Sequence, residues 1–99
     1  MGHSLKAAFL MESRIAEAAE GDVEALCALG VAYSAGSDGT DVDLIEAHKW
    51  FNLAALNGSE RAQESRAEIA DYMSAREIAQ AQRQARAWLS ATCVNRIAA

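Results

Sequence analysis

Apolar and small residues between positions 21 and 62 recur at the spacing of α-helices. Ala25, Leu29 and Tyr33 lie four residues apart, which places them on one side of a helix. A second apolar run, residues 44–57, has the same periodicity. β-branched residues are too scattered to alternate as they do in strands, and the chain has no proline to interrupt a helix. The pattern therefore predicts an all-α protein.

The same periodicity, with its stop signals, divides the chain into about five helices. We expect them at about residues 5–19 (with Ser4 as a cap), 23–35, 44–57, 60–72 and from 75 onward. Asp22 and Asp43 precede two of the apolar runs, where a side-chain oxygen can accept a hydrogen bond from a free backbone N–H. Gly36 and Gly58 follow those runs, where a residue in the left-handed conformation closes a helix. Ser74-x-x-Glu77 has the spacing of a capping box and opens the last helix.

The helices at about 23–35 and 44–57 are apolar most of the way round, which is typical of helices packed on several sides. An interior hairpin of a solenoid is packed in this way, because each repeat stacks on the one before and the one after. We therefore expect one domain, residues 1–99, with these two helices as an antiparallel pair in its interior. The last helix should fold back on the helix at 60–72 and bring Arg83 near Glu64.

Two motifs in this region together resemble a known repeat family. They are Leu29-Gly30-x-x-Tyr33 and Ala47-x-x-Trp50-x-x-x-Ala54-Ala55-x-x-Gly58. The combination is similar to one complete Sel-1-like repeat, a relative of the tetratricopeptide repeats, and covers about two-fifths of the chain. The loop before Asp43 is one residue longer than the family pattern. Residues 21–58 would then be the complete repeat, and 59–99 a degenerate repeat with a C-terminal capping helix.

The resemblance implies a short α-solenoid of antiparallel helix pairs with right-handed, tetratricopeptide-like stacking. It also implies a protein–protein interaction module that acts as an adaptor or scaffold. Members of the family work mostly in bacterial envelope, signalling and host-contact assemblies. Because a fold hosts many functions, the resemblance names no partner.

Charge, apolar run length and cysteine content limit the classes of partner and the cellular location that we expect. The formal net charge is −5, and no basic stripe appears, which argues against nucleic acid as a partner. The longest apolar run near the start, residues 7–11, is too short for a signal peptide or a membrane span. Cys27 and Cys93 are far apart and outside any Cys-x-x-Cys motif, so we expect reduced thiols and a cytoplasmic location.

Catalytic and metal chemistry finds little support in the residues. His48 is expected on the polar strip of its helix, facing solvent, with Glu46 pointing elsewhere. The loop from Ser37 to Asp43 holds three carboxylates but lacks the order of an EF-hand loop. Trp50 and Trp88 lie on apolar stripes: Trp50 is expected in the core, and Trp88, on a terminal helix, is expected there or partly exposed. We predict no catalytic residue, metal or cofactor. The alternative is a small enzyme or small-molecule binder at His48 and the Asp-rich loop.

The expected binding surface lies on the helix at 23–35, opposite the side that faces its partner helix. Its residues are Glu24, Cys27, Ala28 and Val31. In the resembled family the first helix of each hairpin lines the concave surface where partners dock. We therefore predict a shallow apolar groove for another protein or peptide, or for a second copy of this chain as a homodimer. The alternative is that the first and fourth helices close over this surface and make it core.

Overall fold

The computed structural model describes the backbone of residues 2–37 and 39–98, and the side chains of residues 5–37 and 39–92. The helices are α1 (Gly2–Ala19), α2 (Val23–Ala35), α3 (Leu44–Leu56), α4 (Glu60–Ala70) and α5 (Ala75–Ala98). All regular structure in these ranges is helical, so the all-α prediction is confirmed. Ser4 lies inside α1, which begins at residue 2, so the predicted cap at Ser4 is wrong.

The predicted helix boundaries are fixed by side-chain caps. The side chains of Asp22, Asp43 and Ser59 accept hydrogen bonds from the backbone N–H groups of Ala25, Glu46 and Ala62 at 3.0–3.1 Å. Ser74 and Glu77 form a reciprocal capping box: each backbone N–H donates to the other's side chain, at 2.8 and 3.1 Å. Gly36 ends α2 in the left-handed conformation, with φ of 69°. Each N-cap stabilises its helix by about 1 kcal/mol. The predicted caps other than Ser4 are confirmed.

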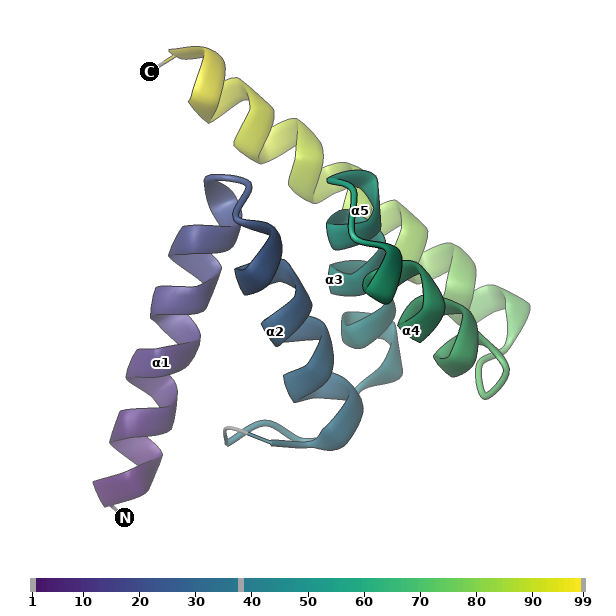
Figure 1. Ribbon diagram of the computed structural model, residues 1–99, viewed down its shortest axis with the longest axis horizontal. Helices are drawn as coiled ribbons and strands as arrows, with labels where there is room; N and C mark the ends of the chain where they lie inside the picture. The colour runs from purple at the N-terminus through teal and green to yellow at the C-terminus, as the bar shows by residue number, and fades with distance from the viewer. Residues whose placement is uncertain (1, 38, 99) are drawn as a thin grey trace.

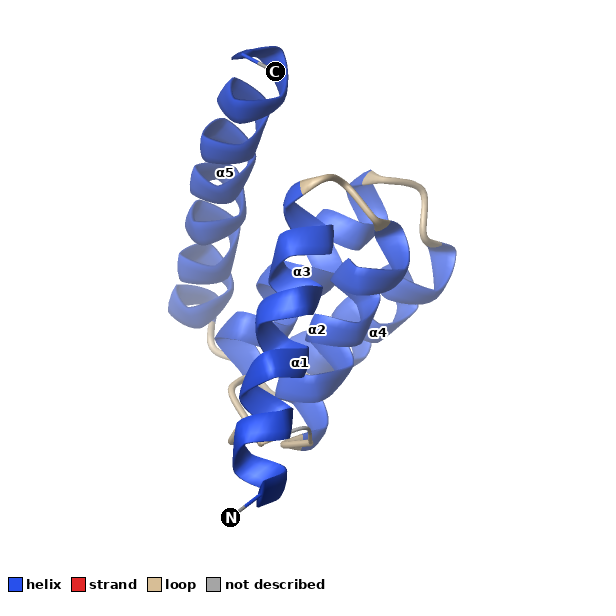
Figure 2. Cartoon of the chain, turned by 90° about the vertical axis from the view of Figure 1, so that its left-hand side faces the viewer, coloured by secondary structure: helices blue, strands red, loops and turns tan. Residues whose placement is uncertain are grey.

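The helices are arranged around α3. α1, α2 and α3 lie side by side and alternate in direction (Figure 1). α3 packs against α2, α4 and α5, whereas α1 packs mainly against α2. Figure 2 shows α5 standing away from α1, so the N-terminal and C-terminal helices lie at different sides of the molecule. The core is therefore centred on α3.

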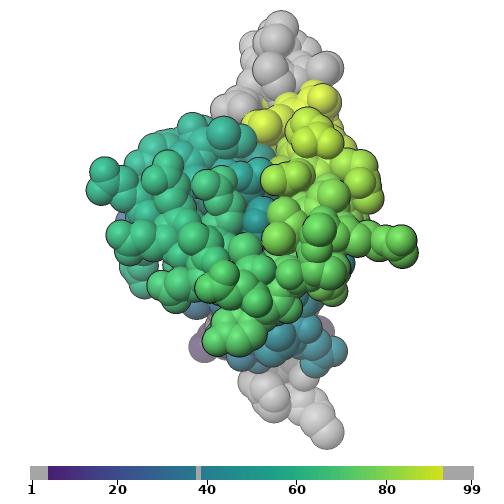
Figure 3. All heavy atoms as spheres, turned by 90° about the vertical axis from the view of Figure 1, so that its right-hand side faces the viewer, coloured from purple at the N-terminus to yellow at the C-terminus, as the bar shows by residue number. Residues whose placement is uncertain are grey.

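The position of α5 differs from the prediction. It packs along α3, and its contact with α4 is slight at most. Seen from the α4–α5 side, blue-green atoms of the α3 region show between the two helices (Figure 3). Within the described side chains, Arg83 and Glu64 form no ion pair, so the predicted pairing of these residues is wrong.

Aromatic packing explains why α5 packs against α3 and not against α4. The ring of Trp50 is 3 % exposed, which confirms its place in the core. Trp88 of α5 meets it edge to face, with ring centroids 4.8 Å apart and planes at 77°. Ala81 and Ala85 are fully buried, and such small residues let the α5 backbone approach closely. The apolar area buried against Trp50 outweighs surface ion pairs, which are worth about 0–1 kcal/mol each.

The α2–α3 contact depends on a glycine. A Cβ on Gly30 would lie 2.5 Å from the ring of Phe51, closer than real Cβ contacts come. Phe51 is itself buried, as are Leu26 and Leu29 beside Gly30. The absent side chain therefore makes room for the ring, as expected for a small residue at a close helix crossing.

Apolar residues of α1 are packed against the core only in its second half. Ala18 is buried, and Ile15 packs against the core. Leu5 and Phe9 are 79 % and 72 % exposed, and Ala8 is also exposed. The first turns of α1 extend beyond the end of α2, so α2 cannot cover them (Figure 1).

Candidate functional site

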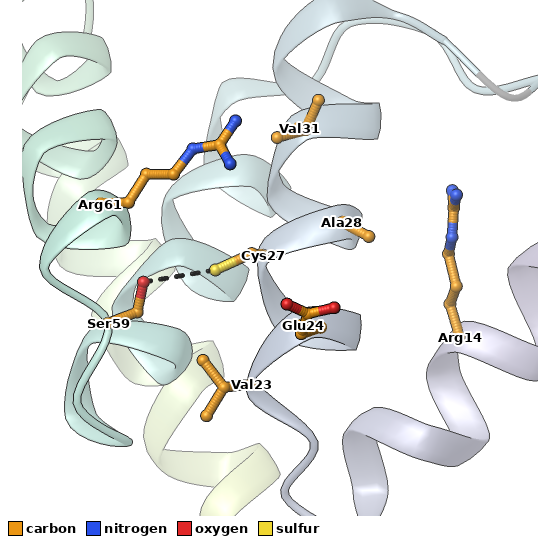
Figure 4. A pocket seen from close by; sticks show the side chains of 8 residues that line it. All are labelled: Arg14, Val23, Glu24, Cys27, Ala28, Val31, Ser59 and Arg61. Atoms are coloured by element: carbon orange, nitrogen blue, oxygen red, sulfur yellow. Dashed lines mark hydrogen bonds between the residues drawn. The ribbon is translucent and has the colours of Figure 1, made fainter.

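A pocket of about 420 Å³ opens between α1, α2 and the start of α4 (Figure 4). We call it the α2 pocket. It is lined by Arg14 of α1, by Val23, Glu24, Cys27, Ala28 and Val31 of α2, and by Ser59 and Arg61 at the start of α4. All four residues predicted for a binding surface lie in this one pocket. That a partner binds there stays a prediction.

The geometry of α2 explains this placement. Val31 lies four residues after Cys27 and three after Ala28, so the three residues share one side of the helix. The opposite side carries Leu26 and Leu29, which are buried against α3. Because α3 occupies that side, the pocket residues lie on the side of α2 away from α3, and Cys27 still packs against the core.

The α2 pocket is open to solvent. Val31 is 43 % exposed, while Cys27 and Ala28 are partly buried. α1 and α4 stand on either side of this surface without covering Val31, so the alternative in which they close over it is wrong at that residue. An apolar surface that its neighbours flank and leave uncovered is a common setting for a binding site.

A side-chain contact fixes one edge of the pocket. The Sγ atom of Cys27 and the Oγ atom of Ser59 lie 3.4 Å apart in a hydrogen bond that either group can donate (Figure 4). The Oγ of Ser59 also caps α4. This pair therefore holds the start of α4 against α2. Cys27 is a free thiol, as predicted, and the side chain of Cys93 lies outside the described residues.

Charged side chains stand around the apolar surface. Arg14 projects from α1 on one side, Arg61 from α4 on the other, and Glu24 lies between them (Figure 4). Arg61 extends from α4 toward Val31 in the same view. Two guanidinium groups and one carboxylate thus line the pocket of a chain whose net charge is −5.

His48 lies inside the fold, so the prediction that it faces solvent is wrong. It is 4 % exposed, and its Nδ1 atom has no hydrogen-bond partner among the described residues. The pKa of His48 is lowered from its usual 6.5, first because burial disfavours the charged imidazolium and second because Arg66 repels it. Since α2, α4 and α5 all pack on α3, the polar strip of that helix is partly covered. A buried imidazole gives no support to an enzyme or ligand site at His48.

Other polar residues of α3 are engaged locally. Glu46 accepts a hydrogen bond from the Trp50 Nε1 at 3.1 Å and pairs with Lys49 at 2.9 Å. The Nζ atom of Lys49 lies 4.4 Å from the Trp50 ring centroid, a cation–π contact. These contacts orient Trp50 at the edge of the core and leave Glu46 committed to structure.

The described part of the chain holds neither a metal-ligand cluster nor a membrane-spanning helix. Among the described residues, no three His, Cys, Asp or Glu side chains are grouped as metal ligands would be. Asp43 caps α3, and Asp38 lies outside the described residues. Within the described chain, every helix is too short or too polar to cross a bilayer.

We compared the chain with protein-family models, with curated proteins and with solved structures, and none of the three comparisons gave a match. The likeness to Sel-1-like repeats therefore stays a resemblance of the motifs themselves.

Proposed function

We propose that this protein is a non-catalytic interaction module that holds a segment of another protein in the α2 pocket. The observation that carries the proposal is the apolar side of α2 at Cys27, Ala28 and Val31, which α1 and α4 flank but leave open. The motif resemblance supports an adaptor or scaffold built as a short solenoid of antiparallel helix pairs.

The dimensions of the pocket suit part of a protein chain. Its volume of about 420 Å³ lies within the range of about 300–1,000 Å³ typical of ligand sites. The lining of α2 extends from Val23 to Val31, about 12 Å at the helical rise of 1.5 Å per residue. Two turns of a partner helix would cover that length. The small side chains of Cys27 and Ala28 leave room for its backbone to approach.

Site-specific photo-crosslinking in cells that express the protein tests this proposal. A photoreactive amino acid replaces Val31 in the pocket, and the same amino acid replaces Val42 in a matched control. Val42 is also an exposed valine, at 60 %, but lies in the loop between α2 and α3, outside the pocket. We expect a discrete adduct from position 31 that is absent at position 42.

Other results of the crosslinking experiment would change this interpretation. An adduct made of two copies of this chain would identify the partner as itself and the assembly as a homodimer. Equal adducts from positions 31 and 42, or none from position 31, would contradict the proposal. Mass spectrometry of the adduct identifies the crosslinked peptide.

A further inference from the structure

We infer that the α2 pocket takes an acidic amphipathic helix, with aliphatic side chains on α2 and a carboxylate toward Arg61. This inference rests on the proposed function and adds the chemistry of the partner. It is carried by the charges on the pocket walls and by the spacing of the apolar residues on its floor.

Basic side chains stand on two walls of the pocket of an acidic protein. Arg14 and Arg61 outnumber Glu24 on the pocket walls, whereas the whole chain carries −5. Arg61 is exposed and forms no ion pair with any described residue. A guanidinium group can bind a carboxylate through two parallel hydrogen bonds. An acidic segment is therefore attracted to Arg61 in this pocket.

The floor of the pocket has the spacing of a helix-docking ridge. Val23, Cys27 and Val31 are each four residues apart, so they form one ridge along α2. Ridges of this spacing pack into the grooves between side chains of another helix. An aliphatic pair four residues apart on the partner would lie against this ridge, between the walls that α1 and α4 provide.

The two ends of the ridge differ in charge, which gives the partner a direction. Arg61 extends toward Val31, and Glu24 lies nearer the Val23 end (Figure 4). A carboxylate on the partner is favoured beside Val31 and disfavoured beside Glu24. The partner helix should therefore carry its acidic residue at one end of the aliphatic pair.

Chemical-shift perturbation of the isotope-labelled full chain tests the inference. The probes are three synthetic amphipathic helical peptides with the same leucine pair and with Glu, Gln or Lys at the flanking positions. We expect the Glu peptide to shift the amides of residues 23–31, Ser59 and Arg61 at the lowest concentration. Sodium aspartate, at the same concentration as the peptide, supplies a carboxylate without a helix.

Charge variants of the protein sharpen the test. Arg61→Glu should weaken binding of the Glu peptide by about fivefold and strengthen binding of the Lys peptide. Glu24→Gln should strengthen binding of the Glu peptide by about twofold. Arg83→Glu is the matched control: it makes the same change in net charge on α5, outside the pocket, and should leave both affinities unchanged.

Each contrary result overturns a definite part of the inference. Equal binding of the Gln or Lys peptide at the same amides refutes the acidic partner and leaves a docking pocket. Equal shifts with sodium aspartate refute the helix and leave a small-anion site. If none of the peptides shifts the pocket amides, the inference is wrong, and crosslinking at Val31 still decides the proposed function by itself.

Discussion

The two sides of α2 carry similar residues but meet different surroundings. On one side Leu26, Leu29 and Gly30 are buried against α3, with Phe51 filling the space above the glycine. On the other side Cys27 and Val31 face the α2 pocket and stay partly exposed. Periodicity shows which residues share a side of a helix. Whether a neighbour covers that side depends on where the other helices pack.

The two sides of α2 therefore differ in how strongly a substitution changes the stability of the protein. Truncating a residue on the α3 side removes buried contacts and leaves a cavity. Changing a residue on the pocket side alters an exposed surface, which usually changes stability by less than about 0.5 kcal/mol. The following variants test that contrast, from the largest expected effect to the smallest.

Trp50→Ala should lower the free energy of unfolding by about 3–5 kcal/mol, a large share of the stability of a small domain. The ring is buried in the core and holds Trp88 of α5 edge to face. Urea unfolding followed by circular dichroism measures the loss. Val42→Ala, at an exposed loop position, is the control, and a loss no larger than that of Val42→Ala would show that the core is not centred on α3.

Gly30→Ala should destabilise the protein by about 1–3 kcal/mol, although alanine favours helices, because the new Cβ collides with the buried ring of Phe51. A double-mutant cycle with Phe51→Leu measures the collision directly. The penalty of Gly30→Ala should shrink in the Phe51→Leu background. An unchanged penalty would place the strain in the backbone and not in the α2–α3 contact.

Acidification should destabilise the protein through His48. Its folded-state pKa lies below the usual 6.5, so between these two values the unfolded state binds more protons. The contribution is complete above about pH 6.5 and is lost as pH falls toward the folded pKa. Urea unfolding at about pH 7.5 and about pH 5.5 tests it. His48→Gln should reduce the difference, and a control substitution of the chain's other histidine, His3→Gln, should preserve it.

Val31→Glu should change the free energy of unfolding by about 0.5 kcal/mol or less, because the side chain is exposed. The same variant should abolish partner binding at the α2 pocket, since a carboxylate on the floor disrupts an apolar contact. A large fall in melting temperature with unchanged association would place Val31 in the core and remove the contrast between the two sides of α2.

Local signals in the sequence predicted the helices and their ends well. Asp22 and Asp43 cap as expected because a cap depends on residues only three positions away. The four pocket residues of α2 were also predictable, since they follow from helical spacing once the α3-facing side is known. Val23 could have joined them, because it lies four residues before Cys27.

Features that depend on distant helices could not be predicted in the same way. Arg14 and Arg61 reach the pocket from α1 and α4, and nothing in their local sequence marks them for it. The burial of His48 follows from the packing of three helices on α3. α5 packs against α3 because Trp88 contacts Trp50. In each error, the sequence of one helix alone was used to judge whether its surface is exposed or which helix packs against it.

The attachment of α1 has a consequence for the timescale of pocket opening. α1 packs mainly on α2 and also meets the loop at Gly39, where a Cβ would lie 2.8 Å from the Cβ of Ala7. Separating α1 therefore breaks its contacts with α2 and this loop, and leaves the packing of α2, α4 and α5 on α3 in place. Such partial opening needs less free energy than global unfolding and governs amide-proton exchange in the segment concerned. A partner that touched Arg14 would hold α1 closed and slow that exchange, which would couple partner affinity to the folding of the first helix.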